Sequence, residues 1–350
     1  MRTSATFVLL IAVLASSTDR NLADDTEREA GQPYTVIEWV ADVRVGGDVI
    51  GKVRLADRLL ITEETNGWLW FAARKGWVHH SDTVPFAEAA EHFDTAVADK
   101  PSAETYHQRA VFRLRQNELE PALADLQEAH RHDAKNPAVL NDLGNLHRKL
   151  GQFEKALGDF DELLRLGAKT PEVYTNRGLV HQAAGRHEQA LADFSAALEL
   201  DEKFAPAWEA GGSSRYALGD FRKARENFRH AIRLFPDFAL AHNNLAWLLA
   251  TCSEDDLRDG TAAVTSAQKA CELTGFTSAH YLDTLGAAHA EAGGFEEAVK
   301  RATQAIELAD EDSRTPIEAR LELYNAGRPF RQMSAVDETA TSFGSNEPRE

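Results

Sequence analysis

The sequence predicts a mainly α-helical protein in which a small all-β region precedes an array of helix–turn–helix repeats. Residues 33–84 alternate apolar and polar side chains with a period of two, which is typical of β-strands. From residue 86 onward, small residues recur every 34 positions, at Ala110, Gly144, Gly178, Gly212 and Ala246. Glycines typical of tight turns recur with the same period, at Gly151, Gly185 and Gly219. Such a period indicates one structural unit repeated along the chain.

Composition excludes several classes of protein. The 350 residues include 38 Lys and Arg against 56 Asp and Glu, which gives a net charge of −18. This charge argues against nucleic-acid partners and against adsorption to an anionic membrane surface, because both need clustered cations. Only 2 cysteines are present, too few for a disulfide framework or a four-cysteine zinc site.

The N-terminus has the three-part pattern of a secretory signal. Arg2 is followed by an apolar run from Ala5 to Ala15, broken only by Thr6, and then by small residues at Ser16 and Ser17. The run is shorter than the ~20 residues that a spanning helix needs. Residues 1–17 are therefore predicted to be a signal peptide, with an uncleaved anchor as the alternative, and the polar residues 18–32 a linker.

Five short strands are expected within residues 33–84. They are Ala41–Val45, Val49–Leu55, Leu59–Thr65, Trp68–Phe71 and Trp77–His79. Asn66 and Gly67 separate two of these strands and favour a two-residue hairpin, because both central residues of a type I′ turn need positive φ. The pattern predicts a small closed sheet.

This β region resembles a bacterial SH3-like domain. The resemblance lies in Val43–Gly47, Val49–Gly51, Asn66–Trp68 and Lys75–Val78. It implies a barrel that docks to cell-wall material or peptides. Trp68, Trp70 and Trp77 are the candidate ligand-binding aromatics. Two interpretations stay open: these rings fill the barrel core, or they form an exposed platform.

The helical part resembles tetratricopeptide repeats. The turns Gly151-Gln152-Phe153 and Gly219-Asp220-Phe221, each followed by Lys-Ala, carry the resemblance. Further repeat positions hold alanine and a large apolar residue, at Ala122, Ala156, Ala190 and Ala224, and at Leu126, Phe160, Phe194 and Phe228. Six repeats are counted: 103–136, 137–170, 171–204, 205–238, 239–278 and 279–312. The phenylalanines are expected to fill the gaps between neighbouring repeats.

The remaining segments are interpreted by comparison with the 34-residue repeat. Residues 86–100 match the second helix of a repeat and are predicted to form a half-repeat. Residues 313–326 form an amphipathic helix suited to cap the array, and the polar residues 327–350 are expected to be a disordered tail. The fifth repeat carries about six extra residues around Ser253–Gly260, which are expected to bulge from the helix–helix turn.

No catalytic or metal-binding motif is evident. The sequence lacks phosphate-binding glycine loops and the common hydrolase motifs. His147, His181 and His289 share one repeat position and are predicted to pack between helices, because stacked repeats hold them too far apart for a common ion. Cys252 and Cys271 are predicted to be buried free thiols, since about 15 Å of helix separates them, beyond the reach of a disulfide. No cofactor is expected.

The tetratricopeptide resemblance implies that an extended peptide binds the concave face formed by the first helix of each repeat. By repeat position, the groove residues are His107, Asn141, Asn145, Arg148, Asn176, Gln182, Glu209, Tyr216, Asn243 and Trp247. Their amides either pair with a peptide main chain or line a solvated groove. Asn141, Pro206 and Ala210 stand where the family's carboxylate-clamp subclass has cations, so binding of chaperone tails is not expected.

These observations predict an exported, non-enzymatic adaptor of bacterial origin that binds a protein or peptide segment in the repeat groove. It would act outside the cytoplasm, in the periplasm or secreted, with no nucleic-acid partner and no membrane contact beyond the signal segment. The alternative is a cell-wall-targeting module whose SH3-like domain binds peptidoglycan while the repeats recruit a partner. An enzyme would need a closed polar pocket, which an open groove does not provide.

Overall fold

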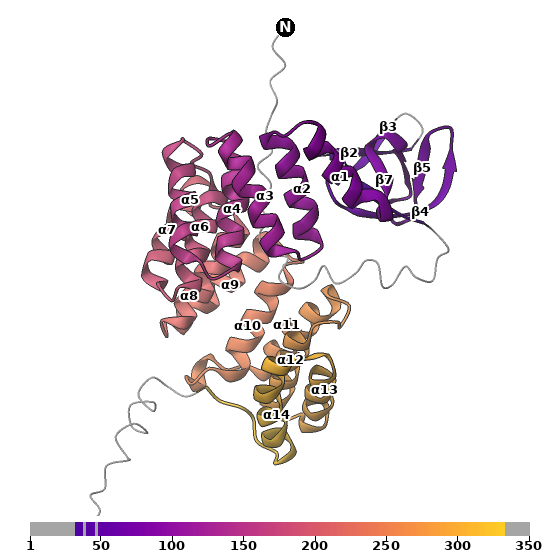
Figure 1. The fold of residues 1–350 in the computed structure, drawn as a ribbon. Coiled ribbons are helices and arrows are strands. Elements are labelled where there is room, and N and C mark those ends of the chain that lie inside the picture. The colour runs from indigo at the N-terminus through magenta and orange to yellow at the C-terminus, as the bar shows by residue number, and fades with distance from the viewer. Residues whose placement is uncertain (1–31, 38–39, 46–47, 333–350) are drawn as a thin grey trace, which may run out of the picture. The chain divides into compact units, whose positions relative to one another are not determined.

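The computed structural model describes residues 32–332, except 38–39 and 46–47 (Figure 1). The predicted signal peptide and residues 333–350 lie outside this range. The predicted fold class is confirmed: a β-sheet region precedes a helical array that has fourteen α-helices among the described residues. The chain divides into two compact units, residues 1–169 and 170–350. The boundary therefore falls between the second and third predicted repeats, and not between the sheet and the helices.

The sheet of the first unit is antiparallel and has seven strands among the described residues. The strands are β1 (Gln32–Val36), β2 (Val40–Val45), β3 (Asp48–Arg54), β4 (Arg58–Thr65), β5 (Trp68–Phe71), β6 (Gly76–His79) and β7 (Thr83–Pro85). They pair in the order β3-β2-β6-β5-β4-β1-β7. Strands β1 and β7 were not predicted; they pair with each other, with Tyr34 opposite Pro85. The prolines at their ends weaken the strand pattern in the sequence.

The predicted Asn66–Gly67 hairpin is present between β4 and β5. Both residues have positive φ, 48° and 80°, and Thr65 pairs with Trp68 across the turn. This is the geometry of a type I′ turn. The sheet encloses a core that includes Val36, Ala41, Val43, Val53, Leu59, Ile61, Leu69 and Val78.

Apart from the first and the last, the helices follow one another in pairs, and each pair forms one repeat. The first unit contains α1 (Ala89–Asp99), α2 (Ala103–Arg115), α3 (Leu119–His132), α4 (Pro137–Lys149) and α5 (Phe153–Arg165). The second contains α6 (Pro171–Ala183), α7 (His187–Leu200), α8 (Ala205–Ala217), α9 (Phe221–Leu234), α10 (Ala239–Thr251), α11 (Gly260–Leu273), α12 (Ala279–Glu291), α13 (Phe295–Leu308) and α14 (Glu311–Asn325). Helix α1 occupies the predicted half-repeat, and α14 the predicted cap.

A glycine and a phenylalanine pack together inside several repeats. A Cβ placed on Gly178 would lie 2.6 Å from the ring of Phe194, and the distances for Gly144 to Phe160 and Gly212 to Phe228 are 2.7 and 2.6 Å. The absence of a side chain lets each phenylalanine ring rest on the backbone of the first helix. The phenylalanines therefore pack within their own repeats, and Phe194 and Phe228 also contact the next repeat, as expected for residues that fill the gaps between repeats.

A polar position with the same 34-residue spacing also joins the two helices of a repeat. It is occupied by Asp125, Asp159, Asp193 and Asn227 on the second helices. In the second unit, Arg177 donates two hydrogen bonds to Asp193, and Arg215 donates one to Asn227. In the first unit, Nδ1 of His147 lies 2.6 Å from Oδ2 of Asp159. This contact confirms His147 as a buried packing residue.

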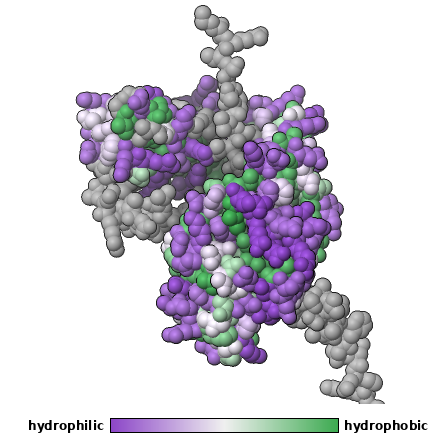
Figure 2. Space-filling model, turned by 180° about the vertical axis from the view of Figure 1, so that it is seen from behind, coloured by the Kyte–Doolittle hydropathy of each residue, from purple (hydrophilic) through white to green (hydrophobic). Residues whose placement is uncertain are grey.

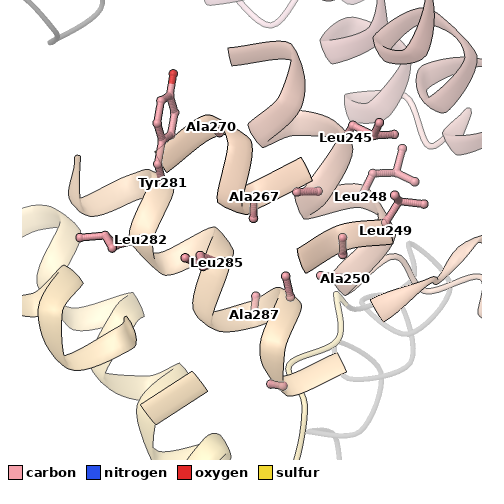
Figure 3. Close-up of a cluster of buried hydrophobic side chains, with 14 of the residues drawn as sticks. Leu245, Leu248, Leu249, Ala250, Ala267, Ala270, Tyr281, Leu282, Leu285 and Ala287 are labelled. Carbon is pink, nitrogen blue, oxygen red and sulfur yellow. The ribbon is translucent and has the colours of Figure 1, made fainter. Parts of the chain in front are cut away.

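The insertion in the fifth repeat lies in the turn between α10 and α11, where the sequence predicts it, and it packs against the core of the second unit. It forms a short 3₁₀-helix, η4 (Asp255–Leu257), whose Leu257 side chain is 1 % exposed and joins the core of the second unit. Arg258 fixes the segment by donating to the carbonyl oxygen of Cys252 at 2.7 Å. Apolar side chains of α10, α11 and α12 make up much of this core (Figure 3). Cys252 and Cys271 are buried and unbridged, as predicted.

The sheet packs directly on the first helices of its unit. Leu55 and Ala56, from the β3–β4 connection, join Ala89 and Phe93 of α1 and Phe112 of α2 in one buried cluster. The rings of Phe93 and Phe112 lie 5.0 Å apart. Helix α1 thus links the sheet to the repeats by apolar contact.

Candidate functional site

All ten predicted groove residues lie on the first helices of the repeats. In each unit separately, we call the surface formed by its first helices the first-helix face: α2 and α4 form it in the first unit, and α6, α8, α10 and α12 form it in the second. On this face the predicted residues fall into two groups. One group is buried and joins neighbouring repeats, and the other remains accessible to a partner.

The buried group includes His107, Asn141 and Asn176, whose residues are 4 %, 7 % and 1 % exposed. Nε2 of His107 lies 2.7 Å from Oδ2 of Asp142, which links α2 to α4. Asn141 and Asn176 are therefore buried in the free chain, and the pairing of their amides with a peptide stays a prediction. Repeat position assigns a residue to the inner face of a helix, but it does not show how much of the residue is buried.

In the second unit, hydrogen bonds join the first helices in sequence. Gln182 of α6 donates to Ser214 Oγ and to the Ala210 carbonyl of α8, at 3.1 and 3.2 Å. Nδ2 of Asn243 on α10 lies 3.0 Å from Nε2 of His280 on α12. Each such bond satisfies polar groups that the stacking of repeats removes from water.

Glu209 is the central acid of this network. Its Oε1 accepts hydrogen bonds from Ser213 Oγ at 2.8 Å and from Asn244 Nδ2 at 2.7 Å. Burial disfavours the charged form and raises the pKa of Glu209 to about 7. The carboxyl therefore joins α8 to α10 partly as a neutral acid near neutral pH, instead of facing a cationic ligand.

Two accessible residues of the first unit keep unused donors. Asn145 and Arg148 lie one turn apart on α4 and are half-buried. Asn145 Nδ2 and Arg148 Nε are buried atoms without a hydrogen-bond acceptor among the described residues. Burial lowers the pKa of the Arg148 guanidinium. A buried donor without an acceptor is costly, and the partly exposed remainder of both side chains is the part that a partner can contact.

The accessible residues of the second unit are aromatic. Tyr216 of α8 and Trp247 of α10 are half-buried, and both contact residues that follow α14. Burial raises the pKa of Tyr216 to about 12, so the phenol stays protonated and can donate. We call the site formed by these two side chains, with Arg320 of α14, the aromatic site. The Arg320 guanidinium lies 5.4 Å from the ring centre of Trp247.

Residues 328–332, which we call the C-terminal strap, lie on the aromatic site. The phenol of Tyr216 donates to Oε1 of Gln332, and the rings of Trp247 and Phe330 lie 5.9 Å apart. The prediction of a disordered tail from residue 327 is therefore wrong for residues 327–332. The sequence signal was weak: a single apolar residue, Phe330, after a glycine and a proline.

The three candidate tryptophans of the sheet are half-buried. They lie on strands β5 and β6, where Leu69 and Val78 point into the core and Trp68, Trp70 and Trp77 alternate with them. Trp70 and Trp77 contact edge to face at 5.1 Å, and Trp68 meets His79 in the same way at 4.9 Å. The interpretation that these rings fill the core is wrong, because they occupy the opposite, partly exposed face.

The visible surface in Figure 2 is predominantly hydrophilic, with apolar residues in small separate areas. Among residues 32–332, outside the two short gaps, no helix has the length and apolarity to cross a membrane. The aromatic site and the partly exposed side chains of Asn145 and Arg148 are the features of the first helices on which the proposed function rests.

Comparison with known proteins identifies the repeats. Residues 141–204 and 210–270 match the tetratricopeptide repeat family. A tetratricopeptide repeat protein from Parabacteroides merdae is 21% identical, with 68% of this chain and 92% of that chain covered and a TM-score of 0.54. In the Cut9–Hcn1 hetero-tetramer of APC/C, a chain is 14% identical, with 67% of this chain and 46% of that chain covered and a TM-score of 0.58.

These structural likenesses concern the fold alone. No curated protein matches the chain significantly. The chain carries tetratricopeptide repeats, in a mainly helical solenoid that follows an N-terminal β-sheet region.

Proposed function

We propose that this protein is an exported, non-enzymatic adaptor that binds an extended segment of a partner protein on its first-helix face. Tetratricopeptide-repeat arrays are scaffolds for protein–protein interaction. The observation that carries the proposal is the aromatic site, where Tyr216 and Trp247 already contact Gln332 and Phe330 of this chain. Half-buried aromatic side chains with a polar tip are typical anchors of protein interfaces.

The unused donors of α4 support the same function in the first unit. Arg148 keeps its charge in a partly desolvated place without a carboxylate among the described residues. Such a group lowers stability unless a ligand supplies the acceptor. A side chain that destabilises the free protein and has no internal partner is characteristic of a binding site.

Affinity capture from a native envelope extract tests this function. We expect Arg148→Met to lose a partner that the wild type retains, while the thermal midpoint stays equal or rises because an unpaired buried cation is removed. Arg229→Met on the exposed surface of α9 is the matched control and should retain the partner. If Arg148→Met and Trp247→Ala both retain every captured protein, the first-helix face is not the binding surface.

Export is part of the proposal and rests on the sequence pattern of residues 1–17. Expression of the full chain in a bacterial host, followed by mass determination of the mature protein, tests it. Loss of the first 17 residues together with appearance outside the cytoplasm is the expected result. A full-length product in the cytoplasm would refute export.

The sheet supports a second candidate, a cell-wall-targeting module with an SH3-like domain. The observation that favours it is the partly exposed row of Trp68, Trp70 and Trp77. Aromatic rings on an exposed sheet face can stack against sugar rings and peptides. Sedimentation of the full chain with purified peptidoglycan, compared with Trp68→Ala, tests the idea. Trp208→Ala on α8 is the control for loss of a tryptophan elsewhere.

A further inference from the structure

The chain is turned back onto the first-helix face directly after α14. Gly327 adopts a positive φ of 67°, and the amides of Gly327 and Arg328 donate to the carbonyls of Tyr324 and Leu323. These two bonds form a Schellman motif, which ends a helix and redirects the chain. Pro329 follows and prevents the helix from continuing. The path of the strap is therefore built into the end of α14.

The strap crosses the carboxyl ends of two first helices. The Gln332 amide donates to the Thr251 carbonyl at the end of α10, at 2.9 Å. Arg331 forms an ion pair with Glu291 at the end of α12. The carbonyls at a helix end lack partners in the helix and attract donors and cations. The strap thus supplies a hydrogen-bond donor to the end of α10 and a cation to the end of α12.

The side chains of the strap fill the aromatic site. The Arg320 guanidinium lies 5.5 Å from the ring centre of Phe330 and 5.4 Å from that of Trp247, so one cation contacts both rings. Tyr216 holds the side chain of Gln332 by a hydrogen bond. The site thus holds three consecutive residues by three features: the aromatic ring of Phe330, the cation of Arg331 and the main-chain amide of Gln332.

The strap is anchored loosely in comparison with the core beneath it. Phe330, Arg331 and Gln332 are all half-exposed, whereas Tyr324 of α14 is 1 % exposed. Phe330 packs on the outer side of the core of the second unit, so withdrawal of the strap would expose the aromatic site and that side of the core, while Tyr324 would stay in place on α14. A segment tied to its site by a short connection acts at a high effective concentration and excludes competitors until it leaves.

We propose that the C-terminal strap is a built-in competitor for the aromatic site, which accepts an external extended peptide with an aromatic residue followed by arginine once the strap withdraws. This inference rests on the proposed function of the first-helix face and adds its ligand chemistry and its regulation. The partner segment mimics Phe330 and Arg331: its ring packs on Trp247 under Arg320, and its cation pairs with Glu291.

A binding experiment on the full chain tests the proposal. The probe is a fluorescein-labelled, amidated peptide with the sequence of residues 327–332. The strap is weakened by Phe330→Ala/Arg331→Ala, which leaves the chain length unchanged. Phe235→Ala/Arg233→Ala, at the end of α9 and directly after it, is the matched control, because it removes the same two residue types from an exposed place. Fluorescence anisotropy gives the affinity, and circular dichroism confirms that helicity is unchanged.

We expect the strap variant to bind the probe at least tenfold more tightly than the wild type and the control. Adding Trp247→Phe to the strap variant should weaken this binding again. Equal affinity of the wild type and the strap variant, or no binding by either up to 1 mM, overturns the proposal. The envelope capture is a separate measurement and distinguishes the two proposals. If the chain captures a partner but does not bind the probe peptide, the strap proposal is refuted and the adaptor function is not. If the chain binds the probe peptide but captures no partner, the adaptor function is refuted and the strap proposal is not.

Discussion

At the scale of single residues, complementary sizes hold the two helices of a repeat together. Gly144, Gly178 and Gly212 each face a phenylalanine of their own repeat. The first repeat has Ala110 and Leu126 at the same two positions, and both are fully buried. A larger residue on the first helix therefore occurs with a smaller one on the second. This size relation holds in the first four repeats, whereas the fifth and sixth repeats have alanine at the phenylalanine position.

This pairing predicts a non-additive double substitution. Gly178→Ala should lower the free energy of unfolding by about 1–3 kcal/mol, because its Cβ would lie 2.6 Å from the Phe194 ring. Phe194→Leu should lower it through a cavity. The double variant, which reproduces the pair of the first repeat, should be more stable than the sum of the two losses implies. Urea denaturation of the four proteins measures the coupling, and purely additive losses would contradict the size rule.

Glu209 predicts a pH dependence of stability. Burial raises its pKa from 4.5 to about 7, so the folded state binds this proton more tightly than the unfolded state. Between these values the folded state holds more protons, and the free energy of unfolding falls as pH rises. The contribution lost by pH 8 is about 3 kcal/mol.

Glu209→Gln should remove this fall while keeping an oxygen for Ser213 and Asn244. We expect the variant to match the wild type near pH 4.5 and to exceed it in denaturation midpoint at pH 8. Glu307→Gln, at an exposed position on α13, is the control. A difference between variant and wild type that does not change with pH would show that Glu209 is not the titrating group.

At the scale of elements, the sequence predicts whether a segment is a helix or a strand better than it predicts which other segments it packs against. Strands β2–β6 and the helices follow from alternation and the 34-residue period. Strands β1 and β7 are short and carry Pro33 and Pro85, so their pairing depends on contacts far apart in the sequence. The same limit applies to η4, whose Leu257 becomes apolar core only when α10 and α11 meet around it.

The packing of the insertion against the core predicts a stability effect that an exposed loop would not show. Leu257→Ala should lower the free energy of unfolding by about 2–5 kcal/mol, because a buried leucine is replaced by a cavity. Leu308→Ala, where the residue is 45% exposed, should have little effect. Urea denaturation compares the two. Similar small losses would place the insertion outside the core.

At the scale of the whole molecule, the units are defined by packing and not by repeat number. The sheet and helices α1–α5 belong to residues 1–169, and helices α6–α14 to residues 170–350. Repeat position correctly placed the ten groove residues on first helices, but it could not distinguish Asn176, which is buried, from Trp247, which is accessible. That difference depends on which neighbouring side chains cover each residue.

The strap lies outside any repeat, so the 34-residue period does not predict it.

The contact between the sheet and α1 predicts cooperative behaviour in the first unit. Phe93→Ala should cost about 3–5 kcal/mol, because the ring is 1 % exposed and packs against Phe112. Hydrogen exchange should then accelerate in the strands as well as in α1 and α2, with α12 and α13 as the internal reference. Faster exchange confined to α1 and α2 would show that the sheet is stable without them.

The strap also has a mechanical consequence. Gln332 is joined to Thr251 of α10 and to Tyr216 of α8, which precede it by 81 and 116 residues. A force applied at the C-terminus therefore loads α8 and α10 before it can peel away α14. Without the strap, helices would detach one after another from the end. With it, single-molecule pulling should show α10–α14 rupturing together in one step, at a higher force than in the Phe330→Ala/Arg331→Ala variant.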